Sequence, residues 1–178
     1  VVTGRQTPYK KIDVAIKACN KLEAPLAVIG MGPEHEKLNN LAGPTVQMLG
    51  QISDSEVASK VQTARAFLFP GLDDFGISPV EAMAAGTPVI AYKGGGALDY
   101  VEEGKTGVFF EEQDEESLAD AVAAHALCAY PPYTMKARTL VVSCPISCAA
   151  SKKNAVSNYF PIRVLSATIY MSAMLCRA

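Results

Sequence analysis

The sequence predicts an α/β protein with a Rossmann-like, doubly wound parallel sheet of about six strands and helices on both faces. Over residues 1–125, short apolar runs alternate with amphipathic segments of helical length. Most of the apolar runs end at a glycine or proline, which can turn the chain. This order implies right-handed crossovers, and it places ligands outside the carboxyl ends of the strands, in the strand-to-helix loops.

The elements follow one another in strict alternation. Apolar runs predict strands at 1–3, 26–29, 46–49, 66–69, 88–92 and 108–110. Amphipathic segments predict helices at 11–21, 34–41, 54–63, 79–85, 96–102 and 115–126. Beyond about residue 126 the periodicity is poor: 139–142 fits a strand, and 162–176 fits a helix or a strand equally well.

Size and charge exclude several classes of protein. With 178 residues, the chain has room for one domain and a tail. A formal net charge of −2 gives no electrostatic footprint for nucleic acid. No apolar run is long enough for a membrane span, and the first residues lack the apolar core of a signal peptide. Residue 1 is valine, so we expect the chain to start inside a longer protein.

Composition changes abruptly near residue 120. All 18 acidic residues lie in residues 1–120 and all 13 glycines in residues 1–107, whereas residues 121–178 are basic and hold four of the five cysteines. We therefore expect a domain over 1–125 and an atypical basic, acid-free tail over 126–178. The tail has three interpretations: a basic arm for a membrane surface or acidic partner, a poorly structured extension, or sequence from a shifted frame or mis-joined segment. The spacing of Cys144 and Cys148 indicates neither a disulfide framework nor a metal site.

The first strand-to-helix loop, residues 4–13, carries Arg5, Lys10 and Lys11 beside a predicted helix N-terminus. Cations in that position can hold phosphate oxygens. Lysines are usually solvated, however, so the loop alone leaves open whether Lys10 and Lys11 bind anything.

The second loop contains Gly30 and Gly32 directly after an apolar strand, as a dinucleotide-binding fingerprint would. The fingerprint fails because His35 occupies the position of its third glycine. The loop remains a candidate for a close-approach turn next to a nucleotide, and His35 is expected to be a surface helix residue rather than a base.

The third loop, residues 70–90, predicts a helix with a capping box. Ser78 would be the N-cap, Pro79 the first helical residue and Glu81 the reciprocal partner, beside the free backbone N–H groups of Gly76. Residues 53–56 repeat this box without other special features, so the box taken alone favours a purely structural role for Glu81. The presence of Asp73 upstream on the same loop favours a ligand that carries both hydroxyl and phosphate groups, since carboxylates accept hydrogen bonds from hydroxyls.

The same segments resemble a known family. The C-terminal, donor-binding half of retaining glycosyltransferases of family 4, the "glycosyl transferases group 1" set with the GT-B fold, is similar to about residues 1–125. The motifs run in the order and spacing of that family. They are Gly4-Arg5…Pro8-x-Lys10, Val28-Ile29-Gly30-x-Gly32-Pro33, Leu49-Gly50, the 70–90 segment, Gly94-Gly95-Gly96-Ala97-Leu98-Asp99 and Gly104-Lys105-Thr106-Gly107.

The resemblance implies roles for individual residues. Two acids spaced eight residues apart contact the donor in that family, the second at the ribose and the first beside the transferred sugar; here they match Glu81 and Asp73. Asp73 stands where the family has a glutamate and is one methylene shorter. Arg5 and Lys10 match the diphosphate-binding cations, with Lys11 as a weaker alternative to Lys10. The loop amides that match are those of Gly76, Ile77 and Ser78.

The implied function is transfer of a sugar, of the hexosyl type, from a nucleoside-diphosphate sugar with retention at the anomeric carbon, without a cofactor or a metal. The expected partners are the nucleotide sugar, an N-terminal GT-B domain that this chain lacks, and a lipid-linked or soluble glycan as acceptor. The expected location is cytoplasmic, including the inner face of a membrane, and the chain alone is expected to be inactive. A non-catalytic nucleotide-sugar binding module is the alternative. A nucleotide-sugar epimerase is disfavoured by the 70–90 segment, and a serine triad by Val80 in place of the second glycine of its motif.

Overall fold

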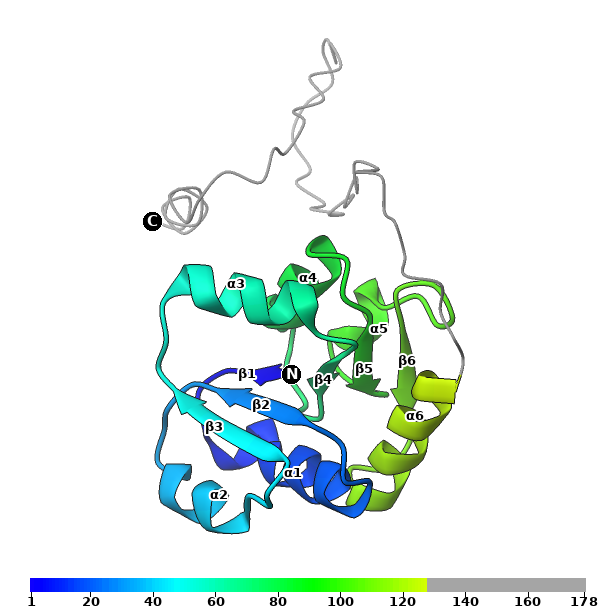
Figure 1. Cartoon of the computed structure of the whole chain (residues 1–178). Helices are drawn as coiled ribbons and strands as arrows, with labels where there is room; N and C mark the ends of the chain where they lie inside the picture. Colours follow the sequence, from blue (N-terminus) through cyan, green and yellow to red (C-terminus); the bar gives the residue numbers. More distant parts are fainter. Residues whose placement is uncertain (128–178) are drawn as a thin grey trace, which may run out of the picture. The chain divides into compact units, whose positions relative to one another are not determined.

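The computed structural model describes residues 1–127, which form alternating strands and helices (Figure 1). The expected tail elements at 139–142 and 162–176 lie outside the described residues. Six parallel strands form two three-stranded sheets, ordered β1-β2-β3 and β4-β5-β6. The strands are Val2–Thr3 (β1), Leu26–Ile29 (β2), Val46–Gly50 (β3), Phe67–Phe69 (β4), Val89–Tyr92 (β5) and Gly107–Phe110 (β6).

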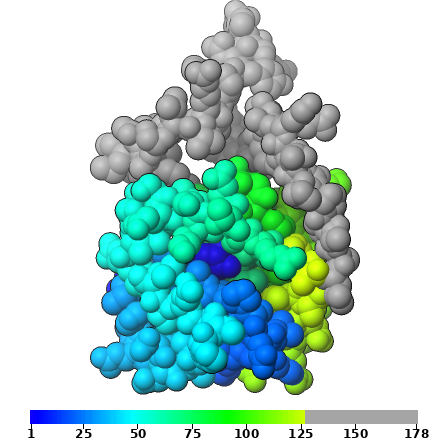
Figure 2. Space-filling model, in the orientation of Figure 1, coloured from blue at the N-terminus to red at the C-terminus, as the bar shows by residue number. Residues whose placement is uncertain are grey.

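Two hydrogen bonds join the sheets along β1 and β4. The Val1 nitrogen donates to the Ala66 carbonyl at 2.9 Å, and the Leu68 N–H donates to the Val1 carbonyl at 2.8 Å. The spatial order is therefore 3-2-1-4-5-6, in which the direction of winding reverses between β1 and β4. Ligands of such sheets bind in the crevice outside the carboxyl ends of the strands at this reversal. In Figure 2 the N-terminal segment, in dark blue, is surrounded by cyan and green segments, in keeping with its central place.

The helices lie close to the ranges expected from the sequence. They are Ile12–Lys21 (α1), His35–Leu41 (α2), Asp54–Thr63 (α3), Ile77–Ala84 (α4), Ala97–Tyr100 (α5) and Glu115–Leu127 (α6). One element was not expected, a 3-10 helix at Pro8–Lys10 (η1) that leads through Lys11 into α1. Among residues 1–127, no helix has both the length and the apolar character that a bilayer crossing requires.

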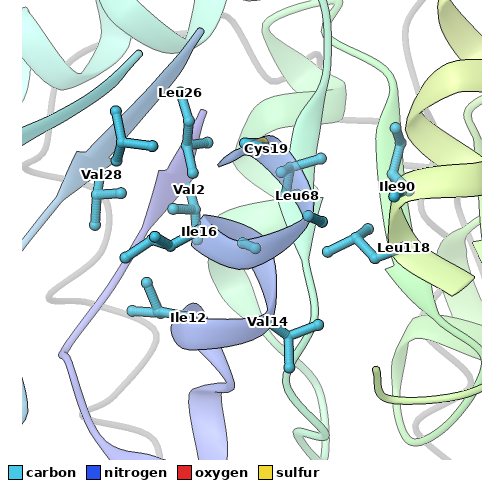
Figure 3. Close-up of a cluster of buried hydrophobic side chains, with 14 of the residues drawn as sticks. Val2, Ile12, Val14, Ile16, Cys19, Leu26, Val28, Leu68, Ile90 and Leu118 are labelled. Carbon is cyan, nitrogen blue, oxygen red and sulfur yellow. The ribbon is translucent and has the colours of Figure 1, made fainter. Parts of the chain in front are cut away.

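Two buried clusters explain why the helices cover both faces. In β4 and β5, Leu68 and Ile90 point to one cluster, whereas their neighbours Phe67, Phe69 and Val89 point to the other. This alternation follows from the two-residue period of a strand. Figure 3 shows the first cluster, where α1 and Leu118 of α6 pack on strands of both sheets. The second cluster is covered by α3, α4 and α5. The predicted doubly wound α/β architecture is confirmed.

The loop after β1 is packed directly against the loop after β2. The Gln6 N–H donates to the Met31 carbonyl at 3.1 Å, and the Gln6 carbonyl accepts from the Glu34 N–H at 3.1 Å. A Cβ atom on Gly32 would lie 2.6 Å from the Gln6 nitrogen, and one on Gly30 would collide with the Gly4 carbonyl oxygen. Glycine is therefore required at both positions, because there is no space for a side chain between the two backbones.

Gly32→Ala should destabilise the protein by about 3 kcal/mol or more, since its new methyl group meets immobile backbone rather than a side chain that can turn away. Gly86→Ala is the matched control: Gly86 has φ +85° but open space around its Cβ position, so only backbone strain of about 1 kcal/mol applies. Urea unfolding followed by circular dichroism measures both. Equal losses for the two variants would contradict the close packing.

Candidate functional site

The loops that follow β1, β4 and β5 meet at the carboxyl ends of the strands. Gly71, after β4, lies against η1: a Cβ atom there would be 2.9 Å from the Lys10 Cα. The Gly96 N–H, after β5, donates to the Asp73 carbonyl at 2.9 Å. The glycine loop 94–96 is thus fixed against the 72–75 segment. Three loops from distant parts of the sequence form one continuous surface.

Lys10 and Asp73 form an ion pair at the centre of this surface. The Lys10 Nζ donates to the Asp73 Oδ2 across the junction between the β1 and β4 loops. Their side chains are only 23% and 13% exposed. The same Nζ lies 5.4 Å from the ring centroid of Tyr9 and 5.9 Å from that of Phe69. Two residues that the sequence assigned to one site are therefore in direct contact.

The predicted capping box at the start of α4 is wrong. The helix begins at Ile77, the N-cap is Gly76 with φ 75°, and no side chain caps it. Pro79 is thus the third helical residue rather than the first, and Ser78 the second. A Cβ atom at Gly76 would lie 2.6 Å from Phe69 and 3.0 Å from the Tyr100 hydroxyl, so glycine is set by both its backbone angle and its neighbours.

The first amides of α4 are consequently free. Within residues 1–127, no acceptor is found for the N–H groups of Gly76, Ile77 and Ser78. These groups carry the positive end of the helix dipole. An anion at this end of α4 would satisfy them.

Arg5, in the loop after β1, and Glu81, in α4, both have exposed side chains. Neither side chain makes a hydrogen bond or an ion pair within the described part of the chain. Glu81 therefore does not cap α4, unlike Glu56, which completes the predicted box at α3: the Ser53 N–H donates to Glu56 at 3.0 Å. The charges of Arg5 and Glu81 are available to a ligand. Lys11 is in the left-handed region at φ 52°, where it joins η1 to α1.

Three residues at the site were missed or misjudged from the sequence. Gln6 is fully buried; its Nε2 donates to the Gly30 carbonyl at 2.7 Å, and its Oε1 is 2.8 Å from the His35 Nδ1. His35 thus has a partner, where the sequence offered none. These contacts span 24 and 29 residues, so no local pattern could reveal them.

Tyr100 is the third. Its hydroxyl is buried beneath Gly76 with no hydrogen-bond partner among the described residues, and its ring makes an edge contact with Phe75 at 5.5 Å. Burial, with smaller contributions from Asp73 and Asp99, raises the pKa of the phenol above its usual value. Tyr100 is therefore neutral at physiological pH and supports the turn that begins α4.

Large apolar side chains surround the site instead of being buried. Phe75, Leu72 and Ile77 of the β4 loop are each about half exposed, as are residues in the three neighbouring loops. The complete set in these loops is Tyr9, Met31, Leu72, Phe75, Ile77 and Leu98. Exposed apolar groups that gather at one edge of a domain indicate a surface that something covers.

A sequence model of the family described as glycosyl transferases group 1 matches residues 1–128. The chain belongs to this family, and its described domain is one Rossmann-like half of a GT-B glycosyltransferase. A phosphatidyl-myo-inositol mannosyltransferase of Mycobacterium leprae is 36% identical over 107 residues, which are 57% of this chain and 28% of that protein. A GDP-mannose-dependent alpha-(1-6)-phosphatidylinositol monomannoside mannosyltransferase of Mycobacterium tuberculosis is 33% identical over 69% of this chain and 37% of its own length.

Solved structures agree with the fold. Sucrose-phosphate synthase from Thermosynechococcus elongatus matches with a TM-score of 0.64 and 29% identity, over 71% of this chain and 36% of that one. The Anabaena protein HepE, solved with UDP and glucose, matches with a TM-score of 0.61 and 24% identity over 69% and 38% of the two chains. The chain thus spans about a third of the length of the relatives it matches.

The difference between the two helix starts predicts different responses to loss of a serine. Ser53→Ala should destabilise the protein by about 1 kcal/mol, because the Ser53 hydroxyl accepts from the Glu56 N–H at the N-cap. Ser78→Ala should cost much less, since Ser78 caps nothing. Thermal unfolding of the two variants tests this; a larger loss for Ser78→Ala would restore the predicted box.

The same box carries a pH dependence. Hydrogen bonds from the Ser53 hydroxyl and N–H lower the pKa of Glu56. A lowered pKa means that the contribution of Glu56 is complete above its ordinary pKa of 4.5 and is lost as the pH falls through the lowered value. The stability difference between wild type and Ser53→Ala should therefore shrink in that acid range.

Proposed function

We propose that this domain binds a nucleoside-diphosphate sugar and presents it for retaining glycosyl transfer. The observation that supports this most directly is the ion pair of Lys10 with Asp73, in the loop that leads into the uncapped N-terminus of α4. Arg5 is an exposed cation on the same loop as Lys10. Cations and free amides around one point form a binding site for two linked phosphates. The proposed roles are diphosphate binding by Arg5 and Lys10, with the amides of Gly76, Ile77 and Ser78.

The same groups would assist departure of the nucleoside diphosphate. Breaking the bond to the sugar builds negative charge on the leaving phosphate oxygens. Fixed cations and a helix N-terminus stabilise that charge more in the transition state than in the ground state. Stabilisation of the leaving diphosphate in this way requires no cofactor. In the proposal, Asp73 lies beside the transferred sugar and Glu81 accepts hydrogen bonds from the ribose.

Gly30 and Gly32 have a more indirect part than that of a turn in direct contact with the nucleotide. Both are explained by their packing on Gly4 and Gln6, and that packing fixes the loop that carries Arg5. We therefore propose that they position the diphosphate clamp, by which we mean Arg5, Lys10 and the first amides of α4. Any contact of the Gly30 or Gly32 backbone with the donor is secondary in this proposal.

The whole protein's activity requires more than this domain. Because the chain spans about a third of its relatives, we propose that a second GT-B domain holds the acceptor and covers the exposed apolar side chains around the site. Relatives that act on phosphatidylinositol derivatives support a lipid-linked acceptor, and with it a place at the cytoplasmic face of a membrane. Sugar transfer by this chain alone would contradict the proposal that a second domain is required.

Arg5→Ala should weaken binding of a nucleoside diphosphate by about 1.5–3 kcal/mol, the usual contribution of a hydrogen bond to a charged group. Arg65→Ala is the matched control: Arg65 is also exposed, but it precedes β4 and so lies at the opposite end of that strand. Calorimetric titration with UDP, GDP and ADP measures both. Equal behaviour of the two variants would show that Arg5 is not part of a clamp.

Glu81→Gln should weaken nucleotide binding by about 1.5–3 kcal/mol without lowering thermal stability, because Glu81 is exposed and caps nothing. Glu56→Gln, at the capped helix, should leave nucleotide affinity unchanged. The same titrations, on variants shown to be folded by circular dichroism, compare the two. If Glu81→Gln has no effect, the ribose assignment is wrong; if no variant and no wild-type protein binds any of these nucleotides, the proposed function itself fails.

A further inference from the structure

We propose that Asp73 competes with the donor's diphosphate for Lys10, so that this carboxylate sets how tightly the domain holds a bare diphosphate. The inference rests on the proposed function, since it concerns the same clamp. It starts from the ion pair itself: Lys10, the cation assigned to phosphate, has the Asp73 carboxylate as its partner in the structure.

The pair is sheltered from water. Side-chain exposures of 23% for Lys10 and 13% for Asp73 place it between a surface pair and a buried one. The rings of Tyr9 and Phe69 lie within 6 Å of the Nζ and exclude solvent from it. Since the attraction of two charges grows as water is removed, this contact is stronger than an ordinary surface pair.

Both backbones are also held in place. Gly71 packs on the Lys10 Cα, and the Asp73 carbonyl accepts from Gly96 while Gly95 lies tightly against it. A surface ion pair loses much of its strength to the entropy of ordering two mobile side chains. Here the main chain of each partner is held by its neighbours, so formation of the pair orders only the two side chains.

A phosphate must therefore exchange places with a carboxylate. While Lys10 is paired its charge is neutralised, and the apparent affinity for a diphosphate is reduced by the fraction of molecules in which Lys10 is free. Arg5 has no partner in the described part of the chain. It is therefore the cation that a phosphate can bind without displacing a carboxylate. Once displaced, the Asp73 carboxylate needs new donors, which the hydroxyls of a sugar supply and a bare diphosphate does not.

The test is a titration of the full chain with inorganic pyrophosphate, which has neither ribose nor sugar, and in parallel with UDP and GDP. Asp73→Asn should raise the affinity about five- to tenfold, as expected for release of a partly buried pair. Asp74→Asn is the matched control: it removes the same charge one residue away, from an exposed side chain without an ion pair among residues 1–127. Asp74→Asn should change the affinity for pyrophosphate by less than about twofold.

A second comparison separates competition from general repulsion of anions. In a Lys10→Met background, Asp73→Asn should no longer raise the affinity, because there is no cation left to release. Asp73→Ala serves as a second variant if Asp73→Asn is not folded by circular dichroism. An equal gain with and without Lys10, or no gain at all, would overturn the inference while the proposed function stands. Absence of binding by wild type and by every variant would overturn both.

Discussion

The position of the loop after β1 is the constraint on which the rest of the site depends. On one side it is hydrogen-bonded through Gln6 to the loop after β2, where Gly30 and Gly32 leave no room for a side chain. On the other side Gly71 brings the loop after β4 against η1. The loop cannot shift toward either neighbour without a backbone collision. Arg5 and Lys10 are therefore presented from a rigid support, which is what a clamp for a charged group requires.

That rigidity arises from the order of the strands. Since β1 and β4 are adjacent only because the winding reverses between them, their loops diverge to opposite faces, and the space between them is available for a ligand. In this protein the two loops are joined by the packing of Gly71 on Lys10 and by the ion pair of Lys10 with Asp73. Lys10 and Asp73 thus neutralise each other at the junction of the two loops, while nearby apolar side chains such as Phe75 and Ile77 are about half exposed.

Most of the fold could be predicted from the sequence, and the reason is local. Apolar runs such as 26–29 and the capping box at 53–56 define their elements within a few residues, and the structure reproduces both. The contacts that build the site are not local. Lys10 and Asp73 are 63 residues apart, and Gln6 and His35 are 29 apart. The family resemblance placed the first pair in one site; nothing in the sequence indicated that the two charges neutralise each other, or that Gln6 is buried. The placement of donor-binding roles stays a prediction.

The wrong prediction of a capping box at α4 shows how a helix that offers free amides differs from one that is capped. Ser78 and Glu81 have the same spacing as Ser53 and Glu56, yet only the second pair forms a box. Gly76, with φ 75° above the Tyr100 hydroxyl, lets the chain enter α4 two residues earlier than a serine cap would allow. A capped helix has satisfied amides and little to offer an anion, whereas α4 keeps its first amides free at a cost in helix stability. The helix that lacks its predicted cap is therefore the one that we propose binds a phosphate, and Glu81, which caps nothing, is exposed on it.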